Sequence, residues 1–341
     1  MRHLIQQKSN NIKFQTLQSN EIMKKLSIII PIYNVEKYIE KCLQSALDIS
    51  IDPKEYEILL INDGTPDNSM IKVADYVSKY EHIKVYEQSN KGLGGARNTG
   101  LKIATGEYVY FLDSDDFLNP EAFSSLFEEG YVQSVDVIIG DYQQIVDEQI
   151  CKIPVNITDR LSEKGADFFV NHYGNSISAS VWTGIYKRSF LINNHLFFFE
   201  NVQFEDANWT PKVLLAAHRV VYIPIVFYNY LIRSGSIIHS SYSLKKLNDI
   251  LCAADDLLKY SRNIEKRAQR KMGYWAVHMT MTSIGRYENI ATLTSSEQNR
   301  INDILKSECF HYFRIRVFLF LYFIFYRQFN CLLKYLMRNR K

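Results

Sequence analysis

The sequence predicts an α/β protein with a mostly parallel β-sheet flanked by helices and a helical extension at its C-terminal end. Short apolar runs alternate with helix-like stretches from Leu26 to about Gly140, an order that produces right-handed crossovers and parallel strands. The following stretch, up to Arg233, is mixed and rich in aromatic residues, and we interpret it as the second half of the same domain. From Leu244 onward, apolar residues recur at spacings of three and four, which is typical of amphipathic helices.

The predicted strands are nearly uninterrupted apolar runs of β-branched and aromatic residues, as in strands buried on both faces. They cover residues 26–32, 58–61, 83–86, 108–112 and 135–139. Between them we predict helices over residues 39–47, 70–80 and 96–104. We divide the chain into a loose N-terminal extension, a sheet domain and a helical C-terminal region, over residues 1–23, 24–240 and 241–341. The run Met23-Lys24-Lys25 directly precedes the first strand, and Met23 is an alternative translation start.

Composition restricts the function classes. The 341 residues include 13% aromatic residues, too many for a mainly disordered chain, and the net charge of +3 gives no basic footprint for nucleic acid. The five cysteines form no CxxC pair, so we expect neither a zinc site nor a disulfide framework, and a reducing cytoplasm fits best. We expect all five to be small buried hydrophobic residues: Cys42, Cys151, Cys252, Cys309 and Cys331.

Polar and aromatic side chains follow three of the predicted strands at their carboxyl ends. Tyr33 follows the first strand, Asp63 the second, and Asp113, Asp115 and Asp116 the fourth. Parallel strands present these ends at one edge of the sheet, where ligands bind in such folds. Carboxylates this close repel one another, and a hard divalent cation would relieve the repulsion. The sequence therefore predicts a metal at Asp113 and Asp115, whereas Asp116 is equally consistent with capping the helix that starts near Pro120.

A glycine-rich stretch lies before the third predicted helix, at residues 90–98. We expect a flexible loop whose glycines let the backbone approach a ligand and whose helix N-terminus favours anions. The glycine spacing does not match a dinucleotide-binding fingerprint.

Four motifs occur in order along the chain: SIIIPIYN at 27–34, LINDG at 60–64, NKGLGGARN at 90–98 and FLDSDD at 111–116. Together they resemble glycosyltransferase family 2, a family of inverting enzymes with the Rossmann-like GT-A fold, and in particular its bacterial members that build surface polysaccharides. The resemblance covers roughly residues 26–240. It implies transfer of a sugar from a nucleotide-sugar, which we expect to be a UDP-sugar, to a hydroxyl of a glycan or lipid-linked glycan.

The resemblance also implies roles for the residues at the predicted edge. Pro31 and Tyr33 would lie at the nucleotide-sugar, with Tyr33 flanking or stacking on the uracil, and Asp63 would accept its N3–H. Arg97 would contact the base or a phosphate. Asp113 would hold the ribose or a metal-bound water, and Asp115 would ligate Mg²⁺ or Mn²⁺ on the diphosphate.

Two acids further along the chain match the family's catalytic pair. By resemblance, Asp206 would be the general base that takes the proton of the acceptor hydroxyl, and Glu205 would bind acceptor or donor sugar. The alternative is that both acids cap a helix N-terminus. Arg233 and Ser236 match an Arg-x-Gly-Ser motif and would clamp the diphosphate, although Ser234 replaces a frequent acid there. Trp182 is equally consistent with a core residue and a sugar platform.

The C-terminal end combines aromatic and basic residues. The run at 317–326 has ten apolar residues, too few for a membrane span, and its basic flanks predict an interfacial helix on anionic lipid. A core helix or a dimer surface is the alternative. We expect a cytoplasmic protein in peripheral contact with the inner face of the membrane.

Two other functions remain open from the sequence. A sugar nucleotidyltransferase would use a similar sheet, but residues 31–34 stand where its glycine-rich loop is expected. A non-catalytic nucleotide-sugar-binding protein on the same fold would not need the acids at 113, 115, 205 and 206.

Overall fold

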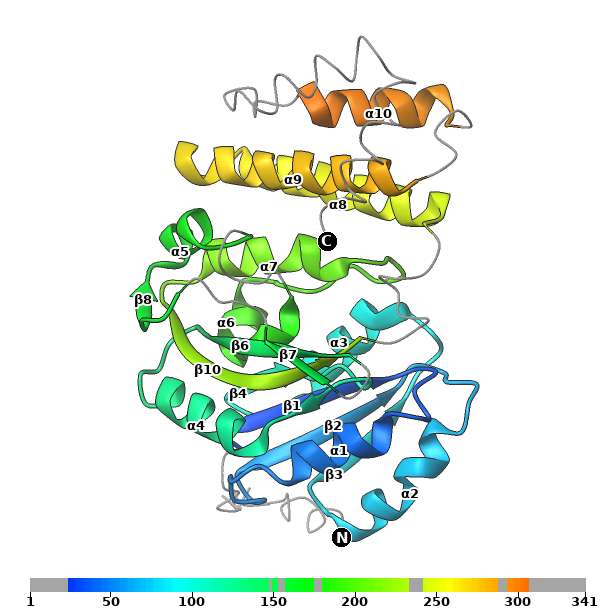
Figure 1. Cartoon of the computed structure of the whole chain (residues 1–341), viewed down its shortest axis with the longest axis vertical. Helices are drawn as coiled ribbons and strands as arrows, with labels where there is room; N and C mark the ends of the chain where they lie inside the picture. Colours follow the sequence, from blue (N-terminus) through cyan, green and yellow to red (C-terminus); the bar gives the residue numbers. More distant parts are fainter. Residues whose placement is uncertain are drawn as a thin grey trace, which may run out of the picture.

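The computed structural model describes residues 24–146, 149–152, 157–174, 180–232, 242–287 and 293–306. Within these residues, one 10-stranded sheet has the order β3-β2-β1-β4-β9-β6-β10-β5, with β7 paired to β6 and β8 to β10 (Figure 1). The predicted interfacial helix and the Arg-x-Gly-Ser motif with Arg233 and Ser236 lie outside the described residues. No helix of the described part is both long and apolar enough to cross a bilayer.

The first half of the sheet is parallel, as predicted. Its strands are β3 (Ile83–Glu87), β2 (Tyr56–Asn62), β1 (Leu26–Ile32) and β4 (Tyr108–Phe111). Every residue of β1 is buried, because sheet neighbours lie on both edges and helices on both faces. Pro31 belongs to this strand and is opposite Ile61 of β2.

The second half of the sheet is mixed rather than mostly parallel. The strand β6 (Val137–Val146) runs parallel to β10 (Val220–Leu231), but β9 (Gly184–Lys187) joins both β4 and β6 in the antiparallel sense. The short strands β5 (Phe117–Leu118), β7 (Gln149–Lys152) and β8 (Leu161–Glu163) also pair in the antiparallel sense. The sheet therefore continues across the change in sequence pattern near Gly140.

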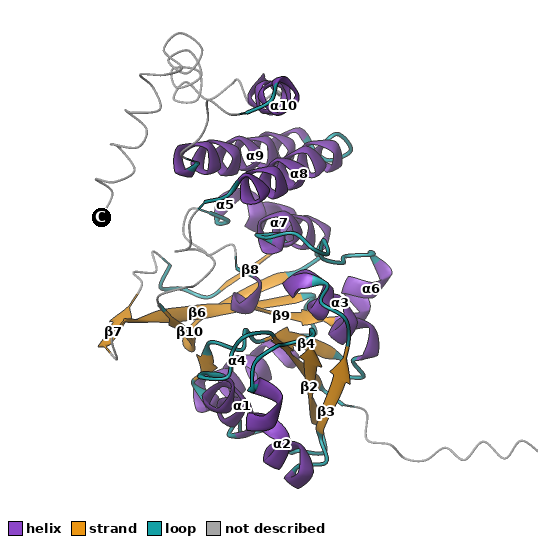
Figure 2. Cartoon of the chain, turned by 90° about the vertical axis from the view of Figure 1, so that its right-hand side faces the viewer, coloured by secondary structure: helices purple, strands orange, loops and turns teal. Residues whose placement is uncertain are grey.

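Helices cover both faces of the sheet. On one face lie α1 (Ile39–Leu47), α2 (Ser69–Lys79) and α4 (Pro120–Tyr131), seen below the sheet in Figure 2. The other side carries α3 (Gly92–Ile103), α5 (Gly165–Asn171), α6 (Arg188–Asn193) and α7 (Glu205–Ala216). The C-terminal helices α8 (Leu244–Ser261), α9 (Lys266–Arg286) and α10 (Ser295–Lys306) stack on α7 in succession (Figures 1 and 2). Helices are thus found in the described residues from Leu244 to Lys306, as predicted, and the rest of the predicted helical region lies outside the described residues.

The glycine-rich stretch is not the flexible loop that we expected, because α3 begins at Gly92 and includes it. A Cβ at Gly94 would lie 2.2 Å from the Phe199 carbonyl oxygen, and a Cβ at Gly95 would lie 2.4 Å from Lys91 Cβ. Gly94 therefore allows the close packing of α3 against the segment after α6, and Gly95 leaves room for the Lys91 side chain at the start of α3.

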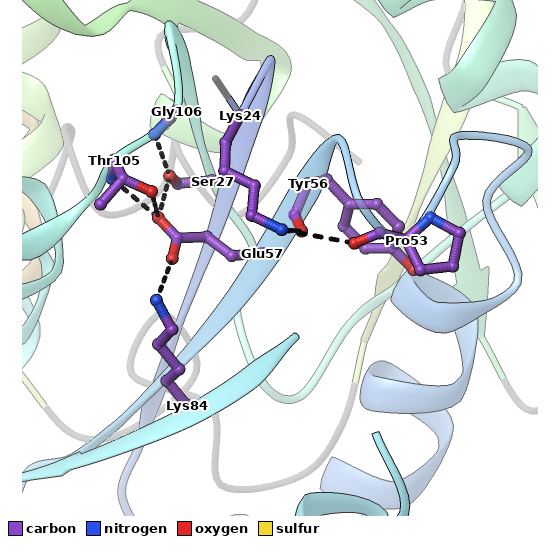
Figure 3. Close-up of polar contacts among 8 residues, drawn as sticks. All are labelled: Lys24, Ser27, Pro53, Tyr56, Glu57, Lys84, Thr105 and Gly106. Atoms are coloured by element: carbon purple, nitrogen blue, oxygen red, sulfur yellow. Dashed lines mark hydrogen bonds and ion pairs between the residues drawn. The ribbon is translucent and has the colours of Figure 1, made fainter. Parts of the chain in front are cut away.

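A buried carboxylate ties strands together at the end of the sheet opposite the predicted ligand edge (Figure 3). Glu57 at the start of β2 is 0% exposed and accepts hydrogen bonds from Ser27 Oγ at 2.8 Å, from Thr105 N and Oγ1 at 2.7 Å each, and from Lys84 Nζ at 3.0 Å. Burial alone would raise its pKa, but these donors lower the pKa of Glu57 below its usual value. Glu57 is thus a structural residue.

Cys252 corrects the expectation that all cysteines are buried. Cys42 is buried in α1, whereas Cys252 lies exposed on α8. Its neighbours Leu251 and Ala253 face inward, and Cys252 falls on the outer side of the helix.

Candidate active site

The carboxyl ends of β1, β2 and β4 meet at one edge of the sheet, because β1 pairs in parallel with both neighbours. Tyr33 directly follows β1 and is 46% exposed, unusual for a large aromatic side chain beside a buried strand. Asp63 directly follows β2, and its amide donates to the Ile32 carbonyl at 3.1 Å. The structure thus brings Tyr33, Asp63 and Asp113 to a common edge, as the sequence predicts.

Asp63 is fixed by the segment that joins β3 to α3. Its Oδ1 atom accepts from Gln88 Nε2 at 2.7 Å and from the Lys91 amide at 2.8 Å, and the residue is 2% exposed. No partner among the described residues binds the other carboxylate oxygen, Oδ2. This geometry suits an acceptor for a ring N–H, the role that the resemblance implies. The sequence did not predict these two donors, because no motif around Gln88 identifies it as a hydrogen-bond partner of Asp63.

Arg97 of α3 occupies the centre of the site. Its guanidinium donates to Asp113 Oδ1 at 2.6 Å and to Glu205 Oε1, the first residue of α7. Burial would lower the pKa of Arg97, but the charges of Asp113 and Glu205 raise it above its ordinary value. The Arg97 guanidinium therefore links Asp113, which follows β4, to Glu205, the first residue of α7.

The partners of Arg97 differ from the expected ones. The side chain is 1% exposed, and the described partners of its terminal nitrogens are carboxylates. Its Nε atom is buried and has no hydrogen-bond partner among the described residues. A direct contact between Arg97 and a nucleotide-sugar stays a prediction.

Asp206 is the second residue of α7 and is half-buried. Burial and the charge of Glu205 raise the pKa of Asp206 to about 7, even though Arg97 acts in the opposite direction. A carboxyl with this pKa takes up and releases a proton near neutral pH, which is what a general base requires. The two acids lie in the first turn of α7, a position that the helix-capping alternative also expects.

The three acids after β4 have different surroundings. Burial raises the pKa of Asp113, and Arg97 offsets only part of that effect. Asp115 is half-buried. Asp116 is 2% exposed and accepts from Tyr228 Oη at 2.5 Å and from the Leu231 amide at 2.7 Å, so it fixes the end of β10. Burial and the charges of the other two acids raise the pKa of Asp116 well above its usual value.

Asp116 does not cap the helix near Pro120, contrary to one of the two alternatives. The cap is Asn119, whose side chain accepts from the Ala122 amide at 3.3 Å. Asp116 is directed to β10 instead because Tyr228 and Leu231 present two donors to it.

The described residues contain no group of three or more His, Cys, Asp or Glu side chains arranged to hold a metal ion. The predicted pair, Asp113 and Asp115, is therefore not completed by a third such side chain in that part of the chain. One oxygen of Asp113 is also engaged by Arg97.

Trp182 belongs to the core. It is 7% exposed and stacks on Tyr228 with ring centroids 4.3 Å apart and on Tyr230 at 5.7 Å. Its ring supports the strand that Asp116 fixes, and the sugar-platform alternative does not fit this burial.

Comparisons with known proteins find similar glycosyltransferases. Residues 27–167 match the Glycosyl transferase family 2. The chain is 34% identical over 209 residues to the uncharacterized glycosyltransferase EpsJ of Bacillus subtilis, an alignment that covers 60% of each chain. It is 27% identical over 282 residues to the poly(ribitol-phosphate) beta-glucosyltransferase of Bacillus spizizenii, covering 81% of this chain and 43% of that protein.

A solved structure shows the same fold. The crystal structure of S. aureus TarS 1-349 in complex with UDP-GlcNAc superposes with a TM-score of 0.64 at 23% identity, covering 82% of this chain and 79% of the TarS 1-349 chain. The chain spans less than two thirds of the length of the curated relatives above, 60% and 43%. Residues 27–167, which contain the four ordered motifs and the ends of β1, β2 and β4, therefore match glycosyl transferase family 2, and the TarS structure shows the same fold beyond them.

Proposed function

We propose that the protein is an inverting glycosyltransferase that moves a sugar from a UDP-sugar to a hydroxyl of a glycan or lipid-linked glycan in bacterial surface-polysaccharide synthesis. The observation that carries the proposal is the placement of Asp206, with a pKa of about 7, beside a glutamate that Arg97 links to the acid after β4. The family and the UDP-GlcNAc bound by TarS support the choice of donor.

The part of the domain that contains β1 to β4 and α3, which we call the donor half, supplies binding groups for a nucleoside diphosphate. The exposed ring of Tyr33 offers a stacking face for the base, and Asp63 offers a carboxylate oxygen for its N–H. Asp113 and Asp115 offer carboxylate oxygens, and Mg²⁺ sites often use one or two carboxylates together with substrate phosphates and water. A bound Mg²⁺ or Mn²⁺ would neutralise the charge on the departing diphosphate.

The reaction is a single displacement. The acceptor oxygen forms a bond to the anomeric carbon as the bond from that carbon to the diphosphate breaks, and the configuration inverts. Asp206 accepts the hydroxyl proton during the attack. The ion pair between Arg97 and Glu205 holds the first turn of α7, and so keeps Asp206 at the position from which it acts.

A donor panel tests this function. Purified protein is incubated with a set of nucleotide-sugars, acceptor glycans and Mn²⁺, and release of UDP is measured. We expect turnover with one UDP-sugar, and we expect Asp206→Asn to abolish transfer while retaining UDP affinity. Full turnover by Asp206→Asn would refute the assignment of the base. Release of pyrophosphate from UTP and a sugar phosphate would indicate a nucleotidyltransferase instead.

A further inference from the structure

The segment that carries Glu205 and Asp206 is held from the C-terminal side by α8 and α9. We call residues 201–212 the acid segment. Before the two acids, the Gln203 amide donates to Asp249 Oδ2 of α8 at 3.0 Å, and the Asn201 carbonyl accepts from Lys245 Nζ at 3.0 Å. Lys245 also pairs with Asp249 at 2.7 Å. The backbone that leads into the acids is therefore bound to one turn of α8.

The same helices bind the acid segment directly after the two acids. Trp275 Nε1 of α9 donates to the Ala207 carbonyl at 3.0 Å. Asn208 Nδ2 donates to the Ala253 carbonyl at 3.1 Å and to Asp256 Oδ2 at 3.0 Å, both on α8. Hydrogen bonds from the C-terminal helices thus hold the chain on both sides of Glu205 and Asp206.

The backbone between these contacts has an unfavourable conformation. Phe204, directly before Glu205, has φ 63° and ψ 37°, and Asn201 has φ 58°. A bulky residue rarely adopts this left-handed region, and such strain persists only where the surroundings fix it. The Phe204 ring stacks on Tyr242, with centroids 6.4 Å apart, just before α8 begins.

The opposite side of the preceding chain is bound to α3. The Asn201 amide donates to the Lys91 carbonyl at 2.9 Å, and Asn98 exchanges hydrogen bonds with the backbone of Phe198. The acid segment thus lies between a helix of the donor half and the C-terminal helices, which are stacked on α7 in Figure 2.

We propose that α8 and α9 position Asp206 for the reaction, with Asp249 and Trp275 as positioning residues that hold the acid segment by its backbone. The inference rests on the proposed function and assigns to the C-terminal helices a part in the chemistry. Neither residue needs to touch a substrate. Removing either contact lets the strained turn relax and moves the carboxylate away from the acceptor hydroxyl.

The first test separates Asp249→Ala from Asp249→Asn. Alanine removes the acceptor for the Gln203 amide, whereas the asparagine side-chain oxygen still accepts that hydrogen bond. We expect Asp249→Ala to lower kcat on the order of 10- to 100-fold, as small displacements of catalytic groups do. The KM for the nucleotide-sugar should stay within about twofold, because the hydrogen bonds and the ion pair of Asp249 involve Gln203 and Lys245 rather than Tyr33 or Asp63. Asp249→Asn should restore most of kcat.

Two further variants complete the test. Trp275→Phe keeps an aromatic ring but removes the N–H donor to Ala207, and we expect the same selective fall in kcat. Asp255→Ala is the matched control, since Asp255 lies on the same helix but pairs with Arg300 of α10. Asp255→Ala should leave kcat unchanged. Thermal unfolding and circular dichroism confirm that each variant is folded.

Hydrogen exchange followed by mass spectrometry gives a readout independent of turnover. Asp249→Ala should speed amide exchange in residues 201–207, and Asp255→Ala should not. Unchanged exchange, an equal loss of kcat in Asp249→Ala and Asp255→Ala, or a change in KM alone would overturn the positioning role. Lack of turnover by the wild-type protein with every donor, together with faster exchange in Asp249→Ala, would overturn the proposed function but not the anchoring of the segment.

Discussion

Arg97 and Glu205 form a buried ion pair although 108 positions separate them in the chain. Arg97 lies in the helix that follows β3, and Glu205 opens the helix that precedes β10. Because the same guanidinium also binds Asp113, the donor edge and the helix that carries Asp206 share one charged centre. The position of the proposed base therefore depends on residues from both halves of the sheet.

Replacing Arg97 by alanine should destabilise the protein strongly. The variant leaves two carboxylates without their cation in a buried site, and breaking a buried ion pair in this way costs about 3–5 kcal/mol. Chemical denaturation measures the loss. The control is Arg160→Ala, which removes an exposed partner of Glu129 and should cost less than about 1 kcal/mol. Equal losses in both variants would contradict the central role of Arg97.

The pH dependence of kcat/KM should show an acidic limb with a midpoint near the pKa of Asp206, about 7. Below that pH the carboxyl is protonated and cannot accept a proton, so activity falls as pH falls through about 7. Initial rates at low donor concentration between pH 5 and 9 measure the limb, since kcat/KM reports the free enzyme. A midpoint near 4, the range of an ordinary aspartate, would show that burial does not raise this pKa.

The same shift predicts that Asp206→Asn stabilises the protein above neutral pH. The carboxyl has an unfolded pKa near 3.8 and a folded pKa of about 7, so the stability contributed by its protonated form is lost as pH rises through 7. Asparagine does not ionise, and the variant should gain roughly 1–3 kcal/mol at pH 8 over the wild type. Denaturation at pH 4 and pH 8 checks this, and the gain should disappear at the lower pH. A gain that is independent of pH would exclude ionisation as the cause.

Tyr33→Ala should weaken UDP binding with little effect on folding. Loss of base stacking costs about 1–3 kcal/mol in other nucleotide-binding sites, which corresponds to at least a fivefold rise in Kd. The ring is 46% exposed, so the free energy of unfolding should change by less than about 1 kcal/mol. Calorimetric titration with UDP measures the effect. Ile71→Ala, which shortens a 73% exposed side chain on α2, is the control and should bind UDP normally.

Asp116→Ala should lower the stability of the protein, whereas Asp115→Ala should change its metal dependence. Asp116→Ala removes the acceptor for Tyr228 and Leu231, and two unsatisfied buried donors cost about 2–4 kcal/mol of stability. Asp115→Ala should change stability by no more than about 1 kcal/mol, but should remove the Mn²⁺ dependence of UDP affinity. Denaturation and titration with and without Mn²⁺ separate the two. Retained Mn²⁺ dependence in Asp115→Ala would exclude this residue as the ligand.

Local patterns predicted the parallel half of the sheet well. The runs over residues 26–32 and 58–61 consist almost entirely of apolar residues because both faces of β1 and β2 are covered. The sequence pattern therefore indicates this burial directly. Tyr33 and Asp63 could be placed at a common edge for the same reason, since parallel strands align their carboxyl ends.

Contacts between distant segments could not be predicted in the same way. The glycines at 94 and 95 suggested flexibility, but their neighbours Phe199 and Lys91 show that they serve packing. The antiparallel insertion of β9 has no local pattern, because a strand of four residues can pair in either sense. The hydrogen bonds of Asp116 to Tyr228 and Leu231 link positions 112 and 115 residues apart, and periodicity carries no information over such separations.

The backbone at Gly94 lies so close to the Phe199 carbonyl that the surfaces of α3 and of the stretch leading into α7 depend on each other. Engineers who wish to alter donor choice by grafting the first half of a relative onto this chain would introduce a different contact surface there. A successful graft has to carry both partners, α3 together with the stretch leading into α7. In such hybrids, two segments that contact each other in the fold but lie far apart in the sequence must therefore be exchanged together.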